Sequence, residues 1–164
     1  MDVVLVEPLI PQNTGSIART CAAVETPLHL VGKLGFEITE KRIRRAGLDY
    51  WPYVKLVKHA SWEEYLLAAR PPRVWLVSKH GEQSYLDADY GPHDALVFGN
   101  EVKGLGKEFL KRYPGQSILI PMSCPAVRSL NLSNAVSIVL FEARRQIAQK
   151  VPHRALLREP LNKV

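Results

Sequence analysis

Short runs with strand character alternate with segments of helical periodicity along most of the chain. The runs expected to form strands are 3–6, 28–31, 55–58, 74–77, 95–98 and 117–120. The helices expected between and after them span 13–21, 39–46, 61–70, 107–112 and 130–150. Strands separated by helices favour a mainly parallel sheet, because parallel strands need a crossover connection that covers the sheet. We therefore predict an α/β fold with helices on both faces of the sheet.

Two of the expected helices have recognisable first residues. Asn13 is expected to cap the first helix, since its side-chain oxygen can accept a hydrogen bond from a free N–H of the first turn. Ser61 is expected to cap a later helix, because Ser61 to Glu64 has the form of a capping box. That helix should end before Pro71, which cannot continue it.

The topology also indicates where a site should lie. Ligands of parallel α/β sheets bind outside the carboxyl ends of the strands. The loops after Val6, Val77, Phe98 and Ile120 are therefore the places where we expect functional residues.

The length and hydropathy pattern fit one globular domain. The 164 residues suit a single domain at 1–150, followed by a tail at 151–164. No apolar run approaches the roughly 18 residues of a membrane span. The first four residues lack the basic start of a signal peptide. We therefore expect a cytoplasmic protein that has no membrane partner.

The net charge of the chain and the spacing of its cysteines and histidines indicate which partners and metals to expect. The net charge is +6, from 22 basic and 16 acidic residues, which fits a polyanionic partner such as nucleic acid. A basic protein without such a partner is the alternative. The two cysteines lie far apart, and the five histidines have no HxH or HxxxH spacing, so no metal site is expected.

The block after the first strand contains Asn13, Gly15 and Arg19. A polar cap, a glycine and an arginine one turn later would place backbone donors and a cation near one helix N-terminus, where anions bind. The alternative is a capped helix with one arginine on its surface.

Two further blocks follow later strands. The block from Gly99 to Gly106 has three glycines in eight residues, which let the backbone turn sharply and approach a ligand. Its spacing is not that of a dinucleotide fingerprint, and a plain turn is the alternative. The block after Ile120 crowds polar side chains at the start of the longest helix, where a helix cap formed by Ser129 or Asn131 is the alternative. These polar residues are Ser129, Asn131, Ser133 and Asn134.

Together and in this order, the three blocks closely resemble the three motifs of the SPOUT class of RNA methyltransferases. The resemblance covers about residues 1–149. The stretch 44–51, Arg-Arg-Ala-Gly-Leu-Asp-Tyr-Trp, resembles the signature of the minimalist branch of this class, which modifies the wobble nucleotide of tRNA.

The resemblance implies a knotted fold and a homodimer. SPOUT proteins thread their C-terminal part into a trefoil knot, which general topology rules would exclude. Their sites lie near the interface of a homodimer. In this sequence the apolar stripe of the last helix, with the first helix, is expected to pack against a second copy; a core within one chain is the alternative. The stripe consists of Leu132, Val136, Val139, Leu140, Ala143 and Ile147.

The cofactor that the resemblance implies is S-adenosylmethionine, bound in a bent form in the knot. Backbone donors and acceptors beside an apolar slot suit its adenine. The positions that match the family's cofactor-binding motifs are Leu76, Val77, Ser78, Gly99, Asn100, Gly104, Ile120, Met122, Ser129 and Leu130.

The implied reaction is methyl transfer to the ribose 2′-oxygen of the wobble nucleotide, a cytidine or a modified uridine, in the tRNA anticodon. The resemblance points to Arg19 as the group that activates the hydroxyl. The residues implied to orient Arg19 or the ribose are Asn13, Glu101 and Asn131. Because a guanidinium keeps its proton at neutral pH, we interpret Arg19 as a clamp for an RNA phosphate and the developing alkoxide rather than as a base.

Basic and aromatic residues supply the expected contacts to RNA. Tyr50 and Trp51 are candidates for stacking on an unpaired base, with packing beneath the basic loop as the alternative. The basic residues expected to bind RNA are Lys41, Arg42, Arg44, Arg45 and Arg128.

Three other functions compete with this interpretation. One is the same chemistry on another tRNA or ribosomal RNA nucleotide, and a second is a non-catalytic RNA-binding protein on the same scaffold. The third is a nicotinamide-dependent oxidoreductase. It would need a glycine fingerprint after the first strand, where Pro8 and Pro11 stand instead.

Overall fold

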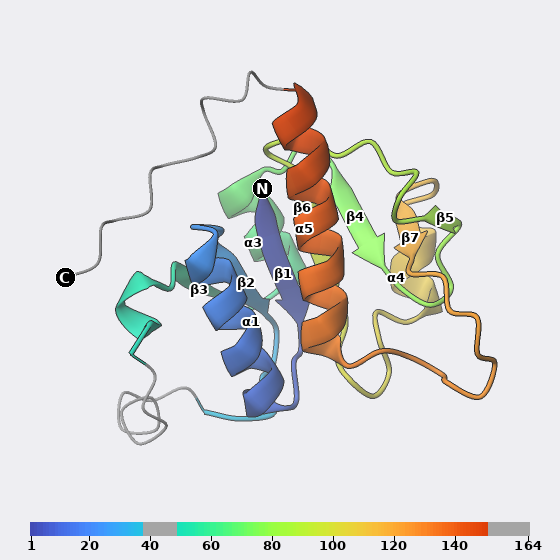
Figure 1. The fold of residues 1–164 in the computed structure, drawn as a ribbon. Helices are drawn as coiled ribbons and strands as arrows, with labels where there is room; N and C mark the ends of the chain where they lie inside the picture. Colours follow the sequence, from blue (N-terminus) through green and yellow to red (C-terminus); the bar gives the residue numbers. More distant parts are fainter. Residues whose placement is uncertain (38–48, 151–164) are drawn as a thin grey trace.

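A parallel sheet runs through the protein, and the computed structural model describes residues 1–37 and 49–150 (Figure 1). Its seven strands lie in the order β3-β2-β1-β6-β4-β7-β5, and every neighbouring pair is parallel. The strands are β1 (Asp2–Val6), β2 (Leu28–Val31), β3 (Leu56–His59), β4 (Val74–Val77), β5 (Gln83–Ser84), β6 (Ala95–Phe98) and β7 (Ser117–Leu119). The predicted α/β class is confirmed, while the two-residue β5 was not expected.

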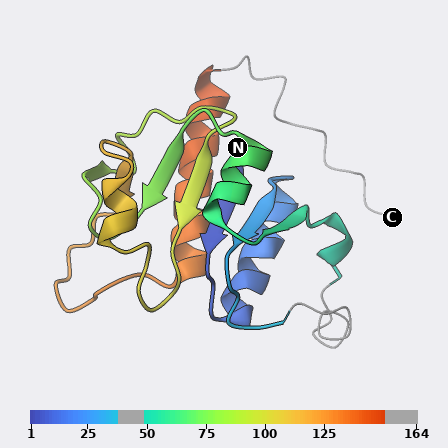
Figure 2. The same ribbon diagram turned by 180° about the vertical axis from the view of Figure 1, so that it is seen from behind.

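Helices cover both faces of this sheet, as expected. The helices α1 (Pro11–Ala23) and α5 (Leu132–Lys150) lie side by side on one face, in front of the strands in Figure 1. On the other face lie α3 (Trp62–Ala69) and α4 (Lys107–Lys111), which Figure 2 shows from behind. A short 3-10 helix, η1 (Trp51–Tyr53), contacts α1.

The central strands are buried on both faces, which explains their uninterrupted apolar sequences. All four residues of β6 are buried. Leu96 and Phe98 face the first core, beneath α1 and α5, whereas Ala95 and Val97 face the second core, beneath α3 and α4. Successive side chains of a strand point to opposite faces, so one short run contributes to both cores.

The apolar stripe of α5 belongs to the first core. Val136, Val139, Leu140 and Ala143 are fully buried there, in one cluster with residues of α1, β1 and β6. The expectation that this stripe meets a second copy is therefore wrong. The alternative, a core within one chain, is what the structure shows.

The first residues of the helices match the sequence prediction in one of two cases. Ser61 caps α3, and its Oγ accepts a hydrogen bond from the Glu64 N–H at 3.1 Å. The prediction for α1 is wrong, because this helix begins at Pro11 and its cap residue, Ile10, makes no side-chain cap. Proline suits the first helical position, where no N–H is needed and its fixed φ is already helical. Asn13 instead lies within the first turn and is only 8% exposed.

Two expected segments lie outside the described residues, namely the basic helix 39–46 and the tail 151–164. The proposed domain limits therefore stay a prediction, and so does the trefoil knot. Within residues 1–37 and 49–150, no helix is long and apolar enough to cross a membrane.

Candidate functional site

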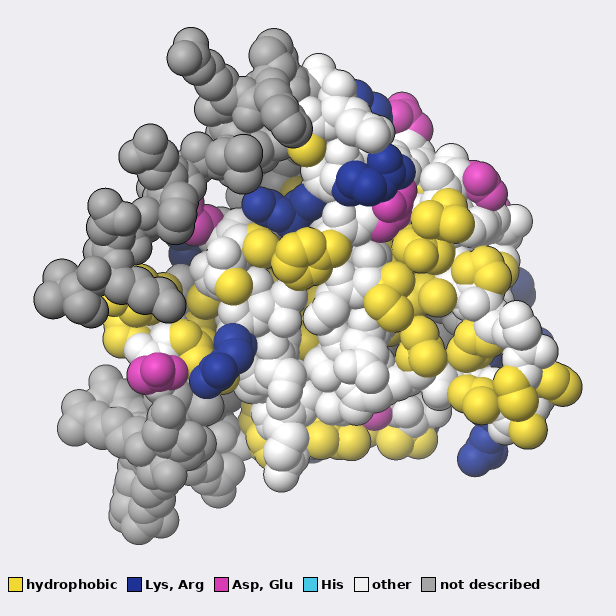
Figure 3. All heavy atoms as spheres, in the orientation of Figure 1, with side chains coloured by type: hydrophobic (Ala, Val, Ile, Leu, Met, Phe, Trp, Pro, Cys, Tyr) yellow, Lys and Arg dark blue, Asp and Glu magenta, His cyan; other side chains and the backbone are white. Residues whose placement is uncertain are grey.

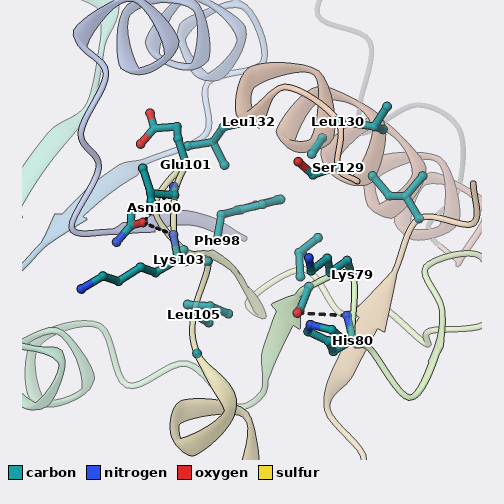
Figure 4. A pocket seen from close by; sticks show the side chains of 18 of the residues that line it. Lys79, His80, Phe98, Asn100, Glu101, Lys103, Leu105, Ser129, Leu130 and Leu132 are labelled. Carbon is teal, nitrogen blue, oxygen red and sulfur yellow. Dashed lines mark hydrogen bonds between the residues drawn. The ribbon is translucent and has the colours of Figure 1, made fainter. Parts of the chain in front are cut away.

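An open cleft of about 630 Å³ lies at the carboxyl ends of β4, β6 and β7 (Figure 4). The loops that follow these strands line it, together with the first turns of α1 and α5. The loop after β1 contributes Ile10 at the entrance to α1. The cleft thus lies at the edge of the sheet where the parallel topology predicts a ligand site.

The expected cofactor-binding residues line this cleft, with the exception of Leu76. The side chain of Leu76 is fully buried in the second core, on the far side of β4. Its neighbour Val77 lines the cleft, as the alternation of side chains along a strand requires. That the lining residues bind a cofactor stays a prediction.

Gly99 stands where the loop after β6 folds back on itself. A Cβ on Gly99 would lie 2.0 Å from the carbonyl carbon of Gly104 and 2.2 Å from the Leu105 nitrogen. These are backbone atoms, so they cannot move aside as a flexible side chain could. Glycine is therefore required here by the close approach of two backbone segments.

Asn100 holds the returning loop in place. Its Oδ1 accepts hydrogen bonds from the Val102 N–H at 3.1 Å and the Lys103 N–H at 2.7 Å (Figure 4). Its backbone oxygen accepts a further hydrogen bond from the Gly104 N–H at 3.0 Å. Gly104 and Gly106 have φ of +63° and +77°, a region that favours glycine, and a Cβ on either would meet open space. The turn therefore leaves its backbone accessible along the cleft.

Glu101 caps α1 from a distant part of the chain. Its Oε2 accepts a hydrogen bond from the Leu9 N–H at 2.9 Å, and its Oε1 accepts one from the Ile10 N–H at 3.2 Å. A carboxylate is favourable at this point because a helix N-terminus carries partial positive charge. Burial acts to raise the pKa of Glu101, but the hydrogen bonds from Asn13, Leu9 and Ile10 outweigh it and hold the pKa below its ordinary value.

Asn13 and Asn131 extend this contact to the start of α5. Asn13 Nδ2 donates to Glu101 Oε1 at 3.0 Å, and Asn131 Nδ2 donates to Asn13 Oδ1 at 2.9 Å. Asn131 Oδ1 accepts from the Ser133 N–H at 2.9 Å and so caps α5. Each amide has one orientation that satisfies its partners. Glu101, Asn13 and Asn131 thus form a polar relay that joins the three sequence blocks.

Arg19 does not line the cleft of its own chain. Its side chain is 64% exposed, and its Nη2 lies 3.6 Å from the Asp49 Oδ1. Its Cζ lies over the Tyr50 ring, 4.5 Å from the ring centre. The structure therefore brings three of the four expected catalytic residues together as the polar relay and places Arg19 apart from them.

The residues expected to bind RNA are only partly described. Arg128 is exposed in the loop between β7 and α5. Tyr50 and Trp51 are half-buried against the first core, which supports the packing alternative for both. Tyr53, which was not singled out, is 73% exposed. The remaining basic candidates lie outside the described residues and are Lys41, Arg42, Arg44 and Arg45.

Basic side chains along the cleft were missed by the sequence analysis. Lys79 and His80 follow β4, Lys103 lies in the loop after β6, and all three are exposed (Figure 4). The signal available in the sequence was that they lie in the loops that follow β4 and β6. Basic side chains around a cleft that also has apolar lining suit a ligand with both an aromatic ring and an anionic group. In the described part of the chain, no three His, Cys, Asp or Glu side chains gather as metal ligands.

Comparison with known proteins gives consistent matches over nearly the whole chain. Residues 1–141 match the SpoU rRNA Methylase family. A tRNA (cytidine(34)-2'-O)-methyltransferase from Saccharophagus degradans is 45% identical over 147 residues, which cover 89% of this chain and 95% of that protein. A solved structure concerned with the 2-OH methylation of C/U34 on tRNA has a TM-score of 0.83 at 45% identity, over 90% of this chain and 96% of its own. The SpoU methyltransferase AviRb from Streptomyces viridochromogenes, in complex with the cofactor AdoMet, has a TM-score of 0.74 at 28% identity, over 91% of this chain and 61% of its own.

Two glycines of the sequence blocks should respond in opposite ways to alanine. Gly99→Ala should lower the free energy of unfolding by about 1–3 kcal/mol, because the methyl group collides with backbone. Gly15→Ala should raise it by about 0.5–1 kcal/mol, since alanine favours a helix and its Cβ would lie 3.9 Å from the Tyr50 hydroxyl, an ordinary van der Waals contact. Urea denaturation measures both, and equal effects at the two positions would contradict this account of the loop.

Glu101→Gln should destabilise the protein by about 1 kcal/mol at neutral pH, since it removes a charged cap of α1. The lowered pKa of Glu101 means that its contribution is present above its ordinary pKa and is lost as the pH falls through the folded-state pKa. Urea denaturation should therefore show the difference between wild type and variant shrinking in acid.

Glu108→Gln is the matched control, because Glu108 is an exposed carboxylate in the first turn of α4 and its ion pair is with an exposed lysine, Lys111. It should change stability by no more than a few tenths of a kcal/mol. A pH-independent loss in Glu101→Gln, or an equal loss in Glu108→Gln, would argue against the capping role.

Proposed function

Because the chain belongs to the SpoU rRNA methylase family, we propose that it transfers a methyl group from S-adenosylmethionine to the ribose 2′-oxygen of the wobble nucleotide of tRNA. The observation that carries the proposal is the cleft at which the polar relay joins the three sequence blocks. The Saccharophagus degradans relative, a tRNA (cytidine(34)-2'-O)-methyltransferase, supports this choice of substrate. The proposal includes residues 1–150 as the catalytic domain and a cytoplasmic location.

The chemistry of the cleft fits this cofactor. Val77, Ile120 and Met122 offer apolar surface to the face of an adenine. The accessible backbone at Gly104 offers hydrogen-bonding groups to its edge, and Lys103 suits a carboxylate. When bound, S-adenosylmethionine supplies a methyl group that is activated by its positively charged sulfur.

The part of the protein in this reaction is alignment and charge stabilisation. The ribose oxygen takes the methyl group as the carbon–sulfur bond breaks and the cofactor leaves as a neutral thioether, and negative charge develops on this oxygen as its proton passes to solvent. A guanidinium is a poor base, so we assign Arg19 to an RNA phosphate and to this developing charge rather than to proton removal. The polar relay fixes the start of α1, and thereby the helix that carries Arg19.

We further propose a homodimer in which Arg19 of one copy completes the cleft of the other. Arg19 lies outside the cleft of its own chain, which favours a second copy as its destination. On the outer side of α5, Ile138 and Phe141 are 37% and 54% exposed, on a face where Figure 3 shows hydrophobic side chains at the surface. Packing a second copy there would remove this apolar surface from water, which stabilises association.

Mass spectrometry of tRNA incubated with the protein and methyl-labelled S-adenosylmethionine tests the proposed reaction. We expect one labelled methyl group on the ribose of the wobble nucleotide. Label on another tRNA nucleotide, or in ribosomal RNA offered in parallel, would contradict the proposed substrate but would still support methyl transfer to RNA. Saturable cofactor binding with no label in any RNA would contradict the reaction itself and favour a non-catalytic RNA-binding protein.

Mixing two inactive variants tests the homodimer. Leu130→Asp should block the cleft with a charge at an exposed wall residue, and Arg19→Ala should remove the clamp. If each site combines a cleft from one copy with Arg19 from the other, an equal mixture should regain roughly a quarter of wild-type activity, because half of the dimers have one complete site. A mixture as inactive as its components, despite measured subunit exchange, would show that Arg19 does not act in the partner's cleft.

A further inference from the structure

Tyr50 connects the segment before η1 to two positions on α1. Its hydroxyl donates a hydrogen bond to the Gly15 carbonyl oxygen at 2.9 Å. Its ring lies beneath the Arg19 guanidinium, with 4.5 Å between Cζ and the ring centre. Gly15 and Arg19 are four residues apart on α1 and therefore lie on the same side of the helix. One tyrosine thus contacts both the backbone and the cation of this helix face.

The Tyr50 ring is itself held in place. It is half-buried and packs against the first core. Gly15 has no side chain between the helix backbone and the tyrosine hydroxyl, and even a Cβ there would lie 3.9 Å from that hydroxyl. A larger side chain at position 15 would therefore compete with the tyrosine for space. The ring is fixed both by its packing and by its hydroxyl, so it offers a rigid surface to Arg19.

The contact with the ring does not itself use the N–H groups of Arg19. A cation over an aromatic ring is attracted to the ring face, whereas the guanidinium donors point outwards in the plane of the group. Among the described residues, Asp49 also lies near this group, with 3.6 Å between Arg19 Nη2 and Asp49 Oδ1, but the two side chains are 64% and 88% exposed. Exposed ion pairs hold a geometry weakly. Because the Tyr50 ring packs against the first core whereas the Asp49 side chain is 88% exposed, the ring is the more rigid of these two contacts of the guanidinium.

We propose that Tyr50 is a positioning residue for methyl transfer, which holds the Arg19 guanidinium in the orientation that binds an RNA phosphate and the developing charge on the ribose oxygen. The inference rests on the role proposed above for Arg19. Tyr50 acts through Arg19 and does not itself touch the substrate. A long arginine side chain loses much rotamer freedom when it is ordered, and a fixed ring beneath it reduces that loss on binding.

Steady-state kinetics test this role, with kcat normalised to folded protein by cofactor binding. Tyr50→Leu should lower kcat about tenfold or more, because a small displacement of a positioned group has an effect of this size. The KM for S-adenosylmethionine should stay unchanged. Tyr50→Phe keeps the ring and should retain most of the kcat. Tyr53→Leu is the matched control, since Tyr53 is a 73% exposed aromatic residue of the same segment, and its kcat should stay near wild type.

A double-mutant cycle with Arg19→Ala decides whether Tyr50 acts through Arg19. Adding Tyr50→Leu to Arg19→Ala should lower kcat no further, since the ring then has no guanidinium to position. Effects that multiply in the double variant would overturn the proposal. A loss in Tyr50→Phe or in Tyr53→Leu as large as that in Tyr50→Leu would overturn it as well.

Arg19→Lys separates this inference from the role of Arg19 itself, because lysine keeps the charge but lacks the planar group. Near-normal turnover in Arg19→Lys would contradict the proposed role of Arg19, and the role inferred for Tyr50 would then be wrong as well. A strong loss in Arg19→Lys together with normal kcat in Tyr50→Leu would overturn the inference on Tyr50 alone.

Discussion

The hydrogen bonds of the polar relay hold together the edge of the sheet at which the cleft opens. Glu101 accepts hydrogen bonds from the N–H groups of Leu9 and Ile10, directly before α1, and from Asn13. Asn13 in turn accepts a hydrogen bond from Asn131, which caps α5. Asn13 is only 8% exposed and Glu101 is half-buried, and such polar groups are costly when a partner is lost, so a shift of the loop after β6 disturbs the start of α1. The positions of the first turns of α1 and α5 and of the loop after β6 therefore depend on one another. The shape of the cleft depends on contacts between residues about ninety or more positions apart in the sequence.

Local patterns predicted the local features of this molecule. The apolar runs placed the main strands, and the capping box placed Ser61, because both depend on residues only a few positions apart. Asn13 received the wrong role for the opposite reason. Its position suggested a local cap, whereas its partners Glu101 and Asn131 lie 88 and 118 residues away. The sequence marked the residue as important, but only the fold shows what it contacts.

The sequence also does not show what a given face of a helix packs against. The stripe of α5 would look the same in sequence whether it faced its own sheet or a second copy, and the packing of Val139 and Leu140 with the strands decides the question. Arg19 is a similar case, because six positions separate it from Asn13 but the relay decides which side of α1 meets the cleft. The resemblance assigned both residues to catalysis, whereas in the structure Asn13 lines the cleft and Arg19 lies over the Tyr50 ring.

We propose that S-adenosylmethionine binds in the cleft joined by the polar relay. Titration of the isotope-labelled protein with this cofactor, followed through backbone amide chemical shifts, tests this proposal. We expect saturable shifts concentrated at the loop after β6 and at the entrance to α5, including Gly99, Gly104 and Leu130. Saturable shifts confined to other parts of the chain, or no saturable shifts at all, would contradict it.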